Sequence, residues 1–170
     1  MALVVAEFSA PWSPSLRLVT PAAVLLLLAV TVLGALVGSR QSWLLGMAIS
    51  LTALAVLCGA IACMVRGYVL TSSELEVRRL GWRTHLPLAG LAAVTGEPRA
   101  LLGAMRLFGN GGLFAITGWF WNRRLGRFRA YATDPQRAVL LRYRDGKCVL
   151  VTPHDVQHFI VQVRRMAHIA

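Results

Sequence analysis

The chain has 170 residues, of which 56% are hydrophobic, and its 18 Lys and Arg against 7 Asp and Glu give a net charge of +11. This length leaves room for only one compact domain besides any membrane-spanning segments. The three cysteines, Cys58, Cys63 and Cys148, form no CxxC spacing, so neither a disulfide framework nor a zinc site is indicated.

The N-terminal segment, residues 1–18, is mixed in character and contains Pro11, Trp12 and Pro14. Tryptophan is enriched where a chain meets the membrane–water interface. The segment therefore predicts an extended arm that lies along the interface, rather than a domain of its own.

Two long apolar runs follow at 19–37 and 44–65, and neither contains Asp, Glu, Lys, Arg or His. At 1.5 Å per residue they make helices of roughly 28 and 33 Å, enough to cross a hydrocarbon core of about 30 Å. The sequence therefore predicts a transmembrane helical hairpin over 19–65 with a short turn at 38–43.

Small residues recur at four-residue spacing in both runs, a pattern that lets helices approach closely. They are Gly34 and Gly38, Gly46 and Ser50, and Ala55 and Gly59. Because no ionisable residue lies inside either run, the pattern argues against a transporter, a proton relay or a channel. These six residues are the candidates for helix packing.

Basic residues set the expected orientation of the hairpin. Residues 66–170 hold 16 of the 18 basic residues and 6 of the 7 acidic ones, a net charge of +10, whereas the turn carries only Arg40. The positive-inside rule then places both termini in the cytoplasm. The expected location is the bacterial inner membrane, as a multi-pass protein.

Residues 66–170 have the pattern of a single cytoplasmic β-domain. Strands are predicted at 68–71, 74–79, 85–95, 113–120, 126–131, 139–143 and 148–152. Three hairpins connect them, with turns at 72–73, 121–125 and 144–147; Asp145-Gly146 is the strongest of these signals because both positions favour positive φ.

A helix is predicted to close the chain. Thr152 is a suitable N-cap, Pro153 suits the first helical position and Asp155 supplies negative charge in the first turn. An apolar stripe with helical spacing follows, formed by Val156, Phe159, Ile160, Val163 and Met166. Several strands followed by one amphipathic helix indicate a sheet whose open end the helix covers.

Several segments resemble the bacterial pleckstrin-homology-like (PH-like) domains. They are the run 106–114, Leu125-Gly126, the run 131–134, and Val151-Thr152-Pro153 with Phe159-Ile160. The resemblance covers roughly 68–166 and implies a bent, seven-stranded antiparallel sheet with a C-terminal helix. The expected fold is an α+β membrane protein: a two-helix transmembrane hairpin, then a PH-like antiparallel β-sandwich or barrel capped by an α-helix.

Basic and aromatic residues provide the candidate contact surface. Alternation places Arg127, Arg129 and Tyr131 on one strand face, and Trp119 and Trp121 belong to an aromatic run that cannot be wholly buried. The candidates for contact with lipid or with acidic groups of a partner are Arg78, Arg83, Trp119, Trp121, Arg123, Arg124, Arg127 and Arg129. A generic solvated face remains the alternative.

Two further motifs have residue types that occur in binding sites. The run 109–112 is either a phosphate cradle or a backbone turn that needs positive φ; no Gly-Lys-Ser/Thr follows it. His154 and His158 imitate a metalloprotease signature, but Asp155 stands where glutamate is required and no third ligand follows. No metal, cofactor or catalytic residue is therefore predicted.

The resemblance implies binding or scaffolding rather than catalysis. Relatives with this layout include assembly or accessory factors of large membrane complexes, so a partner of the photosynthetic reaction-centre or light-harvesting type is one candidate. The alternative function is a tethered sensor of anionic phospholipids. Nucleic acid is not expected as a partner, because the chain is membrane-tethered and lacks a recognition helix.

Overall fold

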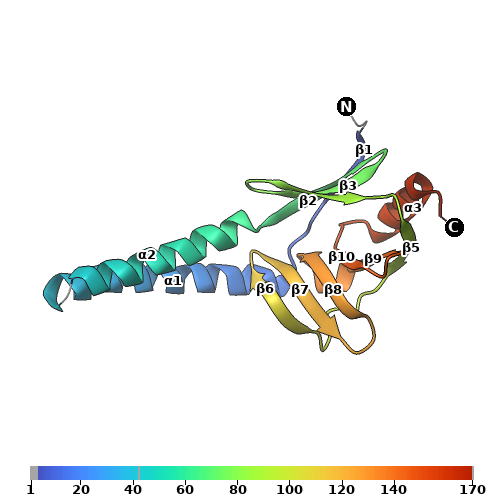
Figure 1. Ribbon diagram of the computed structural model, residues 1–170. Coiled ribbons are helices and arrows are strands. Elements are labelled where there is room, and N and C mark those ends of the chain that lie inside the picture. Colours follow the sequence, from blue (N-terminus) through green and yellow to red (C-terminus); the bar gives the residue numbers. More distant parts are fainter. Residues whose placement is uncertain (1–3, 42, 170) are drawn as a thin grey trace.

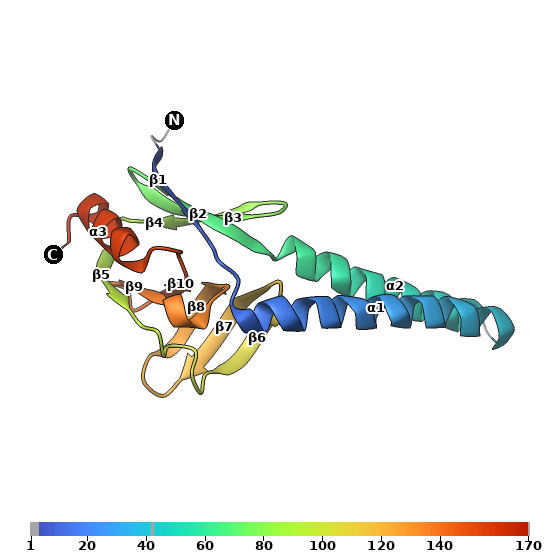
Figure 2. The same ribbon diagram turned by 180° about the vertical axis from the view of Figure 1, so that it is seen from behind.

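The computed structural model describes residues 4–41 and 43–169, and residues 37–41 by their backbone alone. Two long helices, α1 (Pro14–Gln41) and α2 (Trp43–Ala62), lie side by side and project from a domain of β-strands (Figure 1). The helix α3 (Val156–Ala167) lies on the far side of this domain from the hairpin (Figure 2). Two N-terminal helices, a β-sheet domain and a C-terminal helix are thus confirmed.

The first helix is longer than the predicted run 19–37. It begins at Pro14 because the Ser13 hydroxyl accepts a hydrogen bond from the backbone N–H of Leu16 (3.2 Å), and because proline suits a first helical position. At its other end α1 continues to Gln41. Most of the predicted turn at 38–43 is therefore helical.

The second helix ends at Ala62, three residues before the predicted end of the apolar run. The chain turns at Cys63 and Met64, and Val65 already pairs with Arg79 as the first residue of a strand. An apolar residue such as Val65 suits a buried strand as well as a membrane helix, so hydropathy alone does not locate this boundary.

Both helices are long and apolar enough to cross a membrane. The segments are Pro14–Leu36 and Trp43–Ala62, and only 11% and 17% of their most apolar windows are buried within the molecule. A core helix of a soluble domain would be mostly buried. These helices expose many leucines instead, which is typical of a surface covered by lipid or by another protein.

Four strands form the first sheet, in the order β1-β2-β3-β4. They are β1 (Val4–Ser9), β2 (Val65–Thr71), β3 (Glu74–Arg79) and β4 (Arg83–Pro87). The strand β1 pairs antiparallel with β2, and Phe8 lies opposite Tyr68. The sequence predicts an interfacial arm over 1–18, whereas the structure places six of these residues in the sheet.

Six strands form the second sheet, in the order β5-β9-β10-β8-β7-β6. They are β5 (Leu91–Gly96), β6 (Met105–Leu113), β7 (Ala115–Asn122), β8 (Gly126–Ala132), β9 (Val139–Tyr143) and β10 (Cys148–Val151). A single turn of 3₁₀-helix at Pro135–Arg137 connects β8 to β9. The strands β8 and β10 run parallel, so the sheet is not wholly antiparallel as the resemblance implies.

The three predicted hairpins are confirmed as β2–β3, β7–β8 and β9–β10. The predicted strand at 85–95 is instead two strands in different sheets, β4 and β5. Pro87 ends β4, and Gly90 has a φ of +81°, which lets the chain cross from one sheet to the other.

The strand β6 was not predicted, because its glycines at 109–112 indicate a turn. Gly109 lies opposite Gly118 of β7, and both have a positive φ. A Cβ on either would collide with the backbone of the other strand. The glycines therefore permit a close approach of two strands, in agreement with the backbone interpretation of this run.

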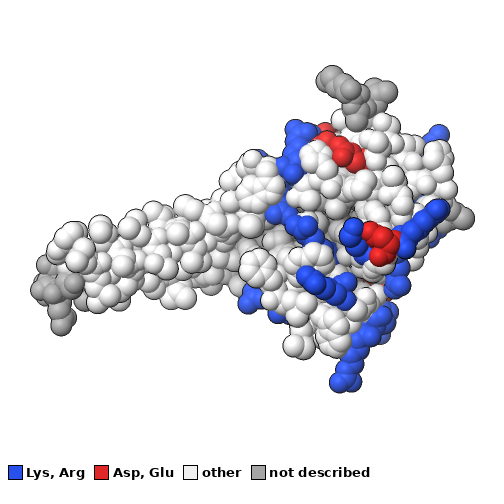
Figure 3. Space-filling model, viewed as in Figure 1, with Lys and Arg blue, Asp and Glu red and all other residues white. Residues whose placement is uncertain are grey.

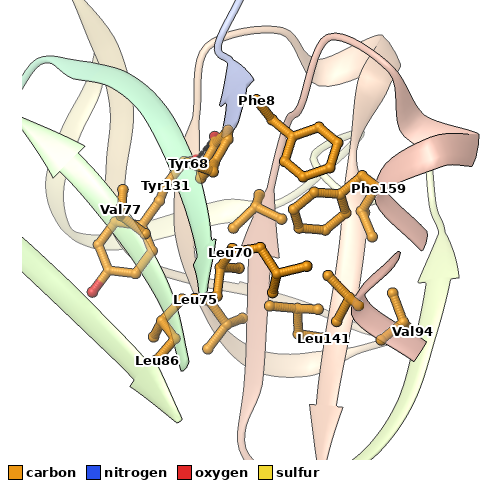
Figure 4. Packing of buried hydrophobic residues seen from close by; sticks show 14 of the residues in the cluster. Phe8, Tyr68, Leu70, Leu75, Val77, Leu86, Val94, Tyr131, Leu141 and Phe159 are labelled. Atoms are coloured by element: carbon orange, nitrogen blue, oxygen red, sulfur yellow. Dashed lines mark hydrogen bonds between the residues drawn. The ribbon is translucent and has the colours of Figure 1, made fainter. Parts of the chain in front are cut away.

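Aromatic and aliphatic side chains from both sheets and from α3 form the core (Figure 4). Phe159 and Val163 of α3 are fully buried, and the Phe159 ring meets those of Phe8 and Tyr68 at 5.0 and 6.3 Å. Val156, Ile160 and Met166 pack around them. The predicted apolar stripe of the closing helix is thus confirmed.

The N-cap of α3 is Asp155 rather than Thr152. The Asp155 carboxylate accepts a hydrogen bond from the His158 N–H at 3.0 Å. Thr152 lies one step earlier and is fully buried; its hydroxyl accepts from the Thr133 N–H at 2.8 Å, and its own N–H donates to the Tyr68 hydroxyl. Thr152 therefore links strands instead of starting the helix.

Candidate functional site

Three of the predicted contact arginines are neutralised within the chain. Arg78 pairs with Glu7 at 3.0 Å, Arg83 with Glu76 at 2.9 Å, and Arg124 with Glu97. Exposed ion pairs contribute little to the free energy of unfolding. In each of these pairs, however, the guanidinium already binds a carboxylate. These arginines are less available to an external anion than the sequence indicates.

Arg127 and Arg129 lie against an aromatic ring instead. Both side chains are exposed on β8, while Phe128 and Ala130 between them are buried. The guanidinium carbon of Arg127 lies 4.3 Å from the centre of the Trp119 ring, and that of Arg129 lies 5.8 Å from it. Arg123 is exposed in the β7–β8 turn and belongs to no such stack.

The stack continues through three residues that are not among the predicted contacts. Arg129 also lies 5.2 Å from the Tyr131 ring; Arg79 of β3 lies 4.8 Å from Tyr131 and 5.4 Å from Trp82. We call the series Trp82, Arg79, Tyr131, Arg129, Trp119 and Arg127 the Arg–aromatic ladder. It joins the first sheet to the second.

The alternation of residues along β8 predicts part of the ladder. It places Tyr131 on the same strand face as Arg127 and Arg129. Alternation does not predict that Arg79 and Trp82, about 50 residues earlier in the sequence, lie across from that face. Their contact depends on how the two sheets pack.

The ladder is electrostatically unusual. Burial lowers the pKa of Arg79, and the positive charge of Arg129 lowers it further. Burial raises the pKa of Tyr131, while Arg129 and Arg79 oppose that change. Among the described residues, no carboxylate forms an ion pair with Arg79, Arg127 or Arg129. Three cations thus share one surface without a counter-ion.

A hollow of about 740 Å³ opens at one end of the ladder. Arg66, Arg79 and Trp82 line it, together with Glu7 and Arg78, which pair with each other, and with Arg83, which pairs with Glu76. Basic side chains gather where the hairpin meets the β-domain, whereas the hairpin itself is almost free of charge on the face shown (Figure 3).

The two predicted tryptophans differ in exposure. Trp119 is half-buried between β8 arginines, whereas Trp121 is 40% exposed and lies opposite Arg127 on the neighbouring strand. Trp119 therefore orients arginines, and Trp121 offers the more open contact surface.

The small residues of the helices fall into two groups. Gly34 and Gly46 are buried between α1 and α2, and the Ser50 hydroxyl donates to the Thr31 carbonyl across the helices at 2.9 Å. Ala55 and Gly59 are exposed, and a Cβ on Gly59 would meet nothing within 4 Å. Gly38 lies outside the residues whose surroundings the structure describes.

The glycine run does not form a phosphate cradle. The Asn110 side-chain carbonyl accepts from the N–H groups of Gly112 and Leu113 at 3.2 and 3.0 Å. Because those donors are already used, they are not free for an anion.

The histidine motif has structural contacts. Asp155 caps α3, His158 packs against Phe8 at 5.5 Å between ring centres, and the carbonyl of His154 accepts from Arg137. These contacts account for the motif without a metal ion.

One further cluster of potential metal ligands, Glu74, Glu76 and His85, lies on β3 and β4, with ligand atoms within 4.8 Å of one another. His85 already contacts Glu74 at 3.0 Å, and Arg83 pairs with Glu76. The sequence places both glutamates on one strand face, toward solvent. The contacts are those of a paired surface cluster.

Two β-sheets closed by a C-terminal helix define the class of the domain as an α+β fold. The comparison with protein families matches residues 66–167 to the family described as Bacterial PH domain, and the chain belongs to that family. Such domains are generally non-catalytic interaction modules. Neither a curated protein nor a solved structure matches the chain.

Proposed function

We propose that the chain is a membrane-anchored accessory or assembly subunit that packs against a larger integral-membrane complex. The observation that carries this proposal is the hairpin: two helices of membrane-spanning length that bury little surface against each other or the β-domain. The domain provides no catalytic constellation among its described residues, and its family points to binding.

The outer face of α2 supports contact with a partner helix. Ala55 and Gly59 lie four residues apart on an exposed part of the helix, and a Cβ on Gly59 would meet nothing within 4 Å. Small residues at this spacing let a second helix approach closely within a bilayer. The buried pair Gly34 and Gly46 already serves this purpose between α1 and α2.

The pairing of β1 with β2 supports placing both ends of the hairpin on one side of the membrane. β1 precedes α1, β2 follows α2, and the two strands are hydrogen-bonded neighbours. The net charge of +10 in 66–170 favours the cytoplasmic side of the bacterial inner membrane.

The test is purification of the full chain from its native membranes in a mild detergent, with mass spectrometry of co-purifying proteins. Stoichiometric integral-membrane subunits would support the proposal and identify the complex, for which the photosynthetic type is one candidate. Purification without such subunits would overturn it.

A matched pair of variants sharpens this test. Gly59→Leu fills the open space on α2 without meeting atoms of the chain itself, so it is expected to reduce partner recovery while the hairpin stays folded. Cys58→Leu places the same leucine side chain at an exposed position about 100° around the same helix and is expected to have little effect.

The second candidate function is a tethered sensor of anionic phospholipid. It is supported by the net charge of residues 66–170 and by arginines that lack a carboxylate partner. It predicts that vesicles with anionic lipid bind the full chain more strongly than neutral ones, and that added salt weakens binding. Equal binding to both kinds of vesicle would exclude it.

A further inference from the structure

The Arg–aromatic ladder presents its guanidinium groups in an orientation that suits an anion. When a guanidinium stacks on a ring, its face is covered, while the N–H groups in its plane stay directed outward. Arg129 is held by two rings, and Arg79 likewise lies near two. Pre-oriented donors of this kind bind phosphate or carboxylate through paired hydrogen bonds.

Two buried polar groups lie next to each other within the ladder. The hydroxyl of Tyr131 and the Nε of Arg79 are both buried, and the neighbouring Arg79 and Thr84 side chains act to lower the pKa of Tyr131 against the effect of burial. Tyr131 is only 1% exposed, and its hydroxyl points away from Phe159 and the apolar core (Figure 4). A guanidinium has five N–H donors, so the contact of Arg79 with one tyrosine hydroxyl leaves donors for an anion.

The ladder lies at the base of the hairpin. Val65, three residues after the end of α2, pairs with Arg79 of β3. The β3–β4 turn, which carries Trp82, extends toward the side on which the helices project (Figure 1). Leu80 and Trp82 in that turn are 53% and 45% exposed.

We propose that the ladder is a binding site for the phosphate of an anionic phospholipid, seated in the hollow between Arg66, Arg79 and Trp82 and continuing toward Arg129. This inference rests on the proposed membrane anchoring and gives the lipid-sensing candidate a specific site. The headgroup contacts the unpaired guanidiniums, while Leu80 and Trp82 contact the interfacial part of the lipid.

Membrane lipid is favoured over other anions by position and by neighbours. In a bilayer crossed by the hairpin, the base of α2 lies at the level of the headgroups. The exposed Leu80 and Trp82 beside the hollow suit an amphipathic ligand. A free phosphate ion or an acidic peptide has no apolar tail that would contact these two side chains.

The experiment uses the full chain in a neutral detergent and follows thermal unfolding. The added probes are short-chain phosphatidylglycerol, short-chain phosphatidylcholine with the same tails, inorganic phosphate and a polyglutamate peptide, at equal ionic strength. Phosphatidylglycerol alone is expected to raise the unfolding temperature. An equal rise with phosphatidylcholine, with inorganic phosphate or with the peptide would overturn the lipid assignment.

Two double variants with equal loss of charge locate the site. Arg79→Gln with Arg129→Gln removes ladder donors and is expected to weaken phosphatidylglycerol binding about thirtyfold, as two lost basic contacts near a membrane surface imply. Arg99→Gln with Arg165→Gln removes exposed charges outside the ladder and should change binding less than about threefold. An equal loss of phosphatidylglycerol affinity in both double variants would overturn the assignment of the ladder as the binding site.

The wild-type comparison of lipids remains decisive should the ladder variant fold poorly. Arg79→Lys with Arg129→Lys adds a further readout, because lysine keeps the charge without the planar fork and should give intermediate affinity. The purified chain needs no partner in this assay. A failed membrane purification would therefore leave this inference standing, and a failed lipid assay would leave the partner proposal standing.

Discussion

The two ends of the β-domain are closed in different ways. At the end far from the hairpin, α3 buries Phe159 and Val163 completely against both sheets. At the end near the hairpin, Arg79 reaches from β3 onto Tyr131 of β8. The first closure is apolar and complete within the chain. The second leaves three cations, Arg79, Arg127 and Arg129, without a carboxylate partner among the described residues.

The apolar end should be the more sensitive to substitution. Phe159→Ala removes a fully buried ring from between Phe8 and Tyr68 and should lower the free energy of unfolding by about 3–5 kcal/mol. Chemical denaturation of the full chain in detergent measures the loss. Val161→Ala, at an exposed position of the same helix, is the control, and a comparable loss there would contradict the comparison.

Alkaline pH should act on the hydrogen bonds that join the two sheets. Burial raises the pKa of Tyr68 to about 12 from 10.0, and its hydroxyl donates to the Tyr131 carbonyl at 2.6 Å. Above pH 10 the unfolded chain loses this proton first, so stability is full below that pH and falls by about 3 kcal/mol as the pH approaches 12.

The check is denaturation at pH 9 and at pH 11 for the wild type and for Tyr68→Phe. The variant begins about 1–3 kcal/mol less stable, because a buried carbonyl and the Thr152 N–H lose a partner, but it loses less on going to pH 11. Tyr143, whose pKa burial also raises to about 12, contributes equally to both proteins. Parallel pH profiles would refute the role of Tyr68.

The cap of α3 should have a smaller effect. Asp155→Ala removes the acceptor for the His158 N–H and should cost about 1 kcal/mol of unfolding free energy. Asp155→Asn retains a side-chain oxygen and should remain near the wild type. If alanine and asparagine behave alike, the helix begins by some other contact.

The smallest effect is expected at the ladder end. Arg127→Gln breaks the 4.3 Å stack on Trp119 and should cost about 0.5–1 kcal/mol without lipid. Arg123→Gln, which removes the same charge from the neighbouring turn, should cost less than half as much. If Arg127→Gln lowered the free energy of unfolding as much as Phe159→Ala does, the proposed difference between the two ends would be wrong.

Local signals in the sequence were enough for much of the fold. Asp145-Gly146 and Ser72-Ser73 located hairpins because turn chemistry depends on a few neighbouring residues. The stripe through Phe159 and Val163 located the buried face of α3. The strand β1 escaped prediction because its partner β2 lies beyond the whole hairpin, and no local pattern reports such a pairing.

The candidate site was predicted only in part for a similar reason. Arg127 and Arg129 were placed on one face by alternation, which is a property of a single strand. Carboxylates distant in sequence, Glu7 and Glu97, turned out to occupy Arg78 and Arg124. Arg79 and Trp82 joined the site only through the packing of one sheet on the other.

The pairing of β1 with β2 has a consequence for the order of biogenesis. The ribosome makes β1 first, but its partner emerges only after both helices have been synthesised. For a hairpin that crosses a bilayer, a helix that fails to insert leaves the two strands on opposite sides, and the sheet keeps a bare edge. In such a hairpin, the first sheet can be completed only when both helices have inserted.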